Sequence, residues 1–355
     1  MATINLATKF EKRLDERFHL QSLTDVACGN QYDWDGVNAI KVWTLDAPVL
    51  TDYNPNGGMS RFGTVSEVTD ELNTYQLMKK RSFSKSFDET NVADQMFVKK
   101  ATAYLQQAWD EAYVPEIDAY RLKVWANGAA SGGYNATALS KTTVVKRLLE
   151  AQATLDDKGV PHENRYIFAR SSVIIGYKLA DEFKTADGIM TKYVIKNQKG
   201  EVDGSPLIAV PDSRMPKGVD FIIKYKQASA DPVKLKKLRA NDNVPGIAGT
   251  LMEGLVRYDA FVLANKADGI YFSSSDTSNV AQNVSFTFAS EKLTLASETS
   301  GTVIKYTTDG RNPKTSDTAQ TYSAAFSIPA GTKVVRAYAS KAGMINSAIT
   351  EYLVE

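Results

Sequence analysis

Residues 73–87 of the chain read NTYQLMKKRSFSKSF, a stretch in which apolar and polar side chains alternate. Alternation predicts β-strands, because successive side chains of a strand point to opposite faces of a sheet. Similar runs begin near residue 46, and Asn54-Pro-Asn-Gly-Gly58 supplies a flexible bend. We therefore expect residues 46–90 to form a long two-stranded excursion. A hairpin of this kind is marginally stable alone and exposes backbone edges that favour pairing with another chain. A hairpin folded back on its own body is the alternative.

The N-terminal segment is expected to contain a short amphipathic helix. Phe10, Leu14 and Phe18 recur at four-residue steps between charged residues, which is helical spacing. The same charges interrupt the apolar run that a secretory signal needs. A helix of about 12 residues is marginal alone, so its thin apolar stripe requires another surface. We expect these three residues to contact a neighbouring copy, as part of an arm over residues 1–45.

The central part of the chain mixes helices and strands. Helical spacing over residues 92–125 predicts a rod of about 50 Å, which Pro115 should kink or split. Two further helices and several strands make this part an α+β body; the helices are expected at 143–155 and 172–183, and the strands at 165–169, 192–196, 206–210, 219–225 and 256–264. The basic run Lys234–Arg239 follows Asp231-Pro232, a favourable helix start. We interpret it as a solvated helix face, with DNA contact as the alternative.

The last part of the chain differs from everything before it. Short alternating runs, separated by turn signals such as Asp309-Gly310 and Asn312-Pro313, predict a small all-β sandwich over residues 283–355. The polar stretch before it places a linker at 273–282.

Composition excludes several classes of protein. The 355 residues carry a net charge of +1, which argues against binding nucleic acid mainly by charge, and no apolar run is long enough for a membrane helix. One cysteine excludes intrachain disulfides and multi-thiolate metal sites. No motif suggests a catalytic, cofactor-binding or metal site, so we expect a protein that is not an enzyme. His19, His162 and the pair Asp156-Asp157 are interpreted as structural or solvated. The glycines of residues 127–133 lack a phosphate-loop context and indicate a flexible connector.

The order of these elements resembles the major capsid protein of tailed phages. The opening ATKFEKRLDERF of residues 7–18 and the stretch KKRSFSKSFDETN of residues 79–91 contribute to the resemblance, which covers residues 1–272. It implies a four-part fold. The parts are an N-terminal arm at 1–45, an extended loop at 46–90, a peripheral domain with a long spine helix at 91–139 and 251–272, and an axial domain at 140–250.

This resemblance implies a function without catalysis. The chain would self-assemble through hexamers and pentamers into an icosahedral head enclosing double-stranded DNA, with weak non-specific DNA contact. In the extended loop, Lys79, Lys80 and Arg81 are candidates for contact with carboxylates of an adjacent subunit. Scaffold, portal and head-completion proteins would be further partners. The protein would be assembled in the host cytoplasm and found in the virion.

The tail carries a second resemblance. The stretch IKYTTDGRNP at residues 304–313, with Tyr322, Pro329 and Tyr338 after it, is similar to the immunoglobulin-like C-terminal module of chitobiases and hexosaminidases. In a capsid protein, this module is expected on the outer surface, where host glycans are candidate ligands. Its removal is expected to leave shells intact. The alternative function for the chain is that of a carbohydrate-binding surface module.

Overall fold

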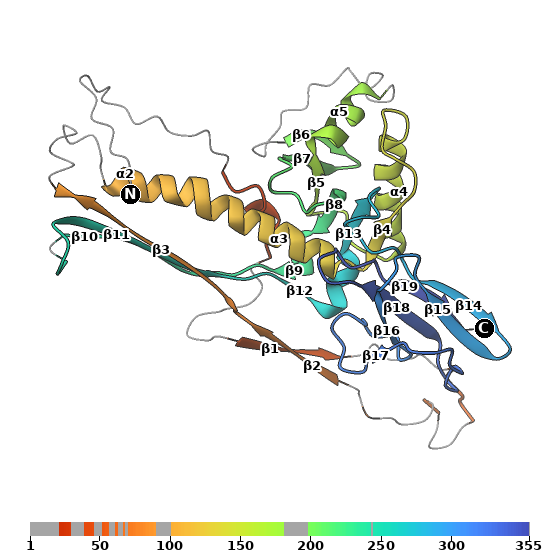
Figure 1. The fold of residues 1–355 in the computed structure, drawn as a ribbon. Helices are drawn as coiled ribbons and strands as arrows, with labels where there is room; N and C mark the ends of the chain where they lie inside the picture. Colours follow the sequence, from red (N-terminus) through yellow and green to blue (C-terminus); the bar gives the residue numbers. More distant parts are fainter. Residues whose placement is uncertain are drawn as a thin grey trace.

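The computed structural model describes residues 21–29, 39–45, 52–56, 61–62, 67, 70–89, 101–180, 198–242 and 244–354. Within these residues the chain forms a long projection of helix and sheet, called the helix–sheet arm, a compact α+β body and a C-terminal β-sandwich (Figure 1). The expected α+β class with an all-β C-terminal module is confirmed.

The helix–sheet arm consists of a helix lying along a three-stranded antiparallel sheet (Figure 1). The strand order is β10–β11–β3, with bounds Val233–Asn241, Gly249–Tyr258 and Lys79–Asp88. The helical rod comprises α2 (Ala101–Ala108), a π-helical turn (Trp109–Tyr113) and α3 (Val114–Gly128). Apolar residues of the rod and of β11 share a small core, which contains Tyr113, Ile117, Val256 and Tyr258.

The rod passes Pro115 without ending. Pro115 lies in the first turn of α3, and the amide of Val114 bonds to the carbonyl of Trp109, five residues back. Proline cannot donate an amide hydrogen to the ladder. The wider π-helical turn before it absorbs this missing bond, so the expected interruption is a local change of winding.

Two expectations for this region are wrong. The basic run Lys234–Arg239 lies in strand β10, because β11 offers it a full antiparallel partner and this pairing overrides the local helix-start signal. The glycine-containing stretch 127–133 is not a free connector. α3 extends to Gly128, and Ser131–Tyr134 forms strand β4, which pairs with β13 (Ile270–Ser274).

The two-stranded excursion also pairs differently from the expectation. Strand β2 (Asp70–Gln76) pairs with β1 (Ala39–Leu45), which lies before residue 46. The following strand β3 pairs with β11, from which it is separated by about half of the chain. Only Leu77 and Met78 lie between β2 and β3, so two consecutive strands that almost adjoin belong to different sheets. A short bridge of β9 (Ser229–Ala230) and β12 (Phe261–Val262) lies nearby.

The body contains a six-stranded mixed sheet of order β4–β13–β8–β5–β7–β6. Besides β4 and β13, its strands are β5 (Arg165–Arg170), β6 (Gln198–Val202), β7 (Ser205–Val210) and β8 (Val219–Tyr225). Helices α4 (Val144–Asp157) and α5 (Ser171–Leu179) cover one face. The C-terminal half of α3 packs on the other, where Trp125 contacts Phe168. The strand expected at 192–196 lies outside the described residues.

The C-terminal sandwich combines a hairpin with a four-stranded sheet of order β17–β16–β18–β19. The hairpin strands are β14 (Ser285–Ala289) and β15 (Lys292–Ala296), and the sheet strands are β16 (Val303–Thr307), β17 (Gln320–Thr321), β18 (Val334–Ser340) and β19 (Thr350–Leu353). Their inward residues form a separate core. Short 3-10 turns occupy Asp25–Ala27, Lys226–Ala228 and Ala264–Gly269.

Candidate functional site

The ribbon of β1 and β2 has one face directed at the body. On this face Asn73 is buried and the ring of Tyr75 lies 5.4 Å from that of Phe261. The hydroxyl of Tyr75 accepts a hydrogen bond from the amide of Ala264 at 3.3 Å. Because side chains alternate along a strand, this contact fixes which residues must point the other way.

The opposite face of the ribbon is apolar and exposed. Trp43 and Leu72 lie directly across from each other in the β1–β2 register, and they are 63% and 39% exposed. We call this pair the ribbon patch. Trp43 differs from two other tryptophans of the chain, since Trp125 is fully buried and Trp109 packs against Lys236 and Tyr113. Within the described residues, the ribbon patch therefore keeps a substantial apolar surface in contact with solvent.

The segment between β1 and β2 exposes further aromatic surface. The rings of Tyr53 and Phe62 lie 5.2 Å apart, and both side chains are more than half exposed. Met78, directly before β3, is 77% exposed. Exposed apolar and aromatic side chains that gather on one surface are a common feature of protein interfaces.

The three cations predicted for intersubunit contact divide between the two faces of β3. On the face toward the helix, the ammonium of Lys79 lies 5.1 Å from the ring centre of Tyr120, and Arg81 forms a 2.7 Å ion pair with Glu116. The bond to Glu116 raises the pKa of Arg81. Lys80 alternates to the other face and is exposed. Two of the three therefore contact the chain's own helix, and a contact with an adjacent subunit stays a prediction.

A cleft of about 480 Å³ lies between β3 and the helical rod. Its walls combine Phe83 and Tyr104 with Glu111 and Lys85, so it has both apolar and charged surface.

The residues predicted for the N-terminal contact, Phe10, Leu14 and Phe18, lie outside the described residues, as does His19. The structure does describe where the end of the N-terminal arm, residues 21–29, contacts the rest of the chain. The buried carboxylate of Asp118 in α3 accepts hydrogen bonds from the hydroxyl of Ser22, the amide of Leu23 and the hydroxyl of Thr24, at 2.6–2.9 Å. Arg214 approaches the same carboxylate at 2.8 Å. This node holds residues 22–24 against the rod.

Sequence reasoning missed the Asp118 node and its neighbour around Arg121. Arg121 contacts Asp25 at 2.6 Å and Thr24 at 3.0 Å, and Lys224 and Asp231 lie buried beside it. The partners are separated by about one hundred residues, so no local spacing could reveal them. The sequence offered one signal: Asp118 and Arg121 lie on the same side of the predicted helix as its apolar residues Ile117 and Leu122.

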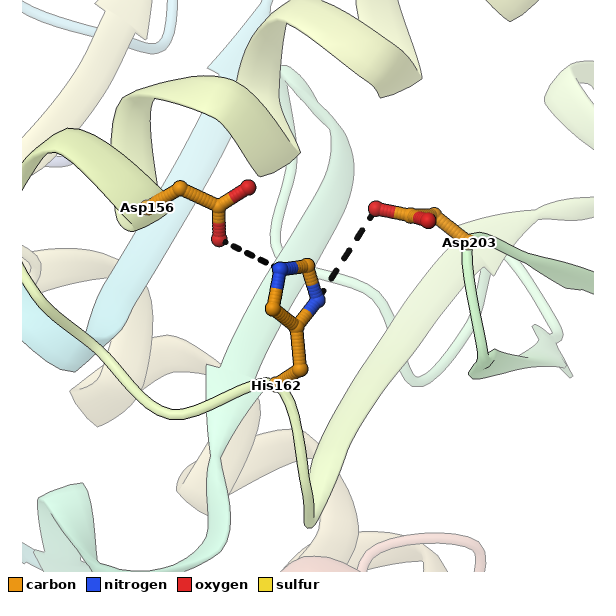
Figure 2. A group of neighbouring side chains, drawn as sticks. All are labelled: Asp156, His162 and Asp203. Atoms are coloured by element: carbon orange, nitrogen blue, oxygen red, sulfur yellow. Dashed lines mark ion pairs between the residues drawn. The ribbon is translucent and has the colours of Figure 1, made fainter.

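The described residues contain one cluster with the ligand types of a metal site. His162 lies in the bend after α4, between the carboxylates of Asp156 and Asp203 (Figure 2). Nε2 is 3.0 Å from Asp156 and Nδ1 is 3.8 Å from Asp203, and Asp156 also binds Arg165 at 2.7 Å. Because the carboxylates approach opposite ring nitrogens, the geometry is that of an ion-pair bridge between α4 and the β6–β7 turn. Asp156 is thus not merely a solvated helix end.

Comparison with solved structures places the fold. A structure from Mycobacterium phage Che8 gives a TM-score of 0.59 at 12% identity and covers 77% of this chain and 99% of that chain. The capsid structure of cyanophage P-SCSP1u gives a TM-score of 0.59 at 12% identity, covering 76% and 92%. The head structure of Helicobacter pylori bacteriophage KHP40 gives 0.52 at 11% identity, covering 76% and 95%.

The C-terminal module matches a family of its own. Residues 283–351 match the family described as chitobiase/beta-hexosaminidase C-terminal domain. No curated protein sequence matches the chain. The chain therefore has the fold of phage capsid subunits, extended by an immunoglobulin-like module of the chitobiase and hexosaminidase type. No described helix is both long and apolar enough to cross a membrane.

Proposed function

We propose that the chain is the major capsid protein of a tailed phage and that it acts as a structural subunit, not as an enzyme. In this proposal, hexamers and pentamers form an icosahedral head around double-stranded DNA. The subunit assembles in the host cytoplasm, with scaffold, portal and head-completion proteins as partners. Its net charge of +1 suits a container that touches packaged DNA weakly. The capsid-type fold supports this class of function.

The observation that carries the proposal is the ribbon patch. One face of the β1–β2 ribbon packs on the chain's own body through Tyr75, and the other exposes Trp43 opposite Leu72. An exposed tryptophan is costly to leave in water and is enriched at the centres of interfaces. We propose that a neighbouring subunit covers the patch, and that the extended loop begins at the β1–β2 ribbon.

The ribbon patch is tested by replacing both residues, Trp43→Ser and Leu72→Ser. Since both side chains point to solvent, the variant should retain the circular dichroism spectrum of the wild type. Electron microscopy and sedimentation should show closed shells for the wild type and free subunits or small oligomers for the variant. Leu353→Ser, at a 71% exposed position of the C-terminal module, is the control and should assemble. Shell formation by the double variant would refute the role of the patch.

The domain boundaries and the display of the C-terminal module on the outer surface also remain proposals. One observation supports glycans as a ligand class for residues 283–355. Phe288 is 50% exposed and its ring stacks on Tyr352 with centroids 6.3 Å apart. The exposed ring of Phe288, beside the partly buried ring of Tyr352, offers apolar aromatic surface to a ligand.

A further inference from the structure

The C-terminal module contacts the end of the spine helix through an extensive buried interface. Tyr338, Ile345, Ala348 and Ile349 of the module belong to the same buried cluster as Trp125 of α3. Val280 and Ala281, directly before the module, have no exposed surface. Ser273 and Ser274, at the start of the stretch expected to be a linker, lie in β13. The module is therefore packed onto the body and does not hang from a free tether.

The interface provides hydrogen-bond donors for backbone carbonyls at the C-terminal end of α3. The last carbonyls of a helix lack partners within the helix and need donors from elsewhere. The last turn of α3 contains no basic residue. Lys314 of the module supplies the donor, since its ammonium lies 2.9 Å from the carbonyl oxygen of Asn127 and 2.7 Å from that of Ala129.

The chain segment that follows α3 is bonded to the module as well. The amide of Ile349 donates to the carbonyl of Ala130, and the side-chain amide of Asn283 donates to the carbonyl of Gly132, each at 3.0 Å. The amide of Asn346 donates to Oδ1 of Asn127 at 3.0 Å. A Cβ on Gly133 would lie 2.3 Å from the side-chain oxygen of Asn283, so the backbone at Gly133 and the Asn283 side chain approach closely.

We propose that the C-terminal module is a structural clamp that caps the spine helix and fixes its connection to the sheet of the body. Lys314 supplies the helix cap, and Ala348 and Ile349 seat the module on the α3–β4 junction. This role is independent of the proposed capsid function, because both sides of the interface belong to one chain. Removal of residues 283–355, which is expected to leave shells intact, would then still expose part of the body core and leave the carbonyls of Asn127 and Ala129 without their Lys314 donor.

The test is hydrogen exchange, followed by mass spectrometry, on the full chain. Ala348 is 1% exposed, so Ala348→Glu should force the module off its seat. In this variant, amides of residues 125–134 should exchange at least about tenfold faster, while amides of β16 and β18 keep their wild-type protection. Thr294→Glu, at an exposed position of β15, is the control and should change neither region. Lys314→Met is the milder second variant, which should accelerate exchange in residues 125–134 even if Ala348→Glu fails to fold.

Two results would overturn the proposal. In the first, residues 345–349 of Ala348→Glu exchange faster, which shows that the module has left its seat, while residues 125–134 remain as protected as in the wild type. In the second, Ala348→Glu changes exchange nowhere, which would show that the seat is loose enough to accept a buried glutamate. Either result would mean that the body alone holds the end of the spine helix.

Discussion

At the scale of single residues, the buried carboxylate of Asp118 determines where the N-terminal arm leaves the body. It is fully buried, and it accepts from two hydroxyls, one backbone amide and a guanidinium. A buried charge is tolerated in proteins when its lone pairs are satisfied in this way. Asp118 therefore couples the spine helix to residues 22–24 and to Arg214.

Replacing this carboxylate should destabilise the protein strongly. Asp118→Asn leaves Arg214 buried without its counter-charge, and breaking a buried pair on one side costs about 3–5 kcal/mol. Denaturant unfolding of the variant measures this loss in the free energy of unfolding. Asp157→Asn, at the exposed end of α4, is the matched control and should change it by less than about 0.5 kcal/mol. A loss of less than about 1 kcal/mol in the free energy of unfolding of Asp118→Asn would show that Asp118 does not anchor the N-terminal arm.

At the scale of elements, packing of the helical rod onto the three-stranded sheet depends on a glycine in β11. Gly254 lies opposite Phe83 in the β3–β11 register. The ring of Phe83 crosses over this glycine and packs near Tyr104 and Tyr113 of the rod, with ring centroids 6.3 and 5.9 Å apart. A Cβ at position 254 would lie 2.3 Å from the ring. The missing side chain is therefore a condition for packing the helix onto the sheet.

Gly254→Val should loosen this packing. Overpacking of a filled site costs about 1–3 kcal/mol, and we expect the loss to appear as a lower melting temperature and as faster hydrogen exchange in β3 and the rod. Leu255→Val changes the neighbouring residue on the opposite, more exposed face of β11 and serves as the control. Equal melting temperatures for Gly254→Val and the wild type would show that Phe83 moves aside without consequence.

At the scale of the whole molecule, docking of the C-terminal module should depend on pH. Burial lowers the pKa of Lys314 from 10.5 to about 7. Between these two values the unfolded chain holds a proton that the folded chain releases, so the free energy of unfolding rises with pH through this window. Below about pH 7 both states are protonated and the ammonium must be desolvated for the module to dock.

This dependence is measured by comparing wild type with Lys314→Met at about pH 6 and about pH 9. The stability of the wild type relative to the variant should increase at the higher pH, because methionine has no proton to lose. Lys333→Met removes an exposed lysine of the same module, and its difference from the wild type should stay constant with pH. Parallel pH curves for wild type and Lys314→Met would contradict a titrating lysine at the interface.

The sequence by itself determined the elements whose signals are local. Alternation and turn residues identified the C-terminal sandwich, and helical spacing identified the rod and α4, because these patterns reflect one buried face of a single element. The tertiary structure alone decided which strands pair, so β3 joined β11 and the basic run 234–239 became a strand. It also decided that Asp118 is fully buried, that Lys314 lies partly buried against the end of α3, and that the C-terminal module is seated on the spine helix. The physical reason is that pairing and desolvation depend on partners far away in the chain, which local periodicity does not record.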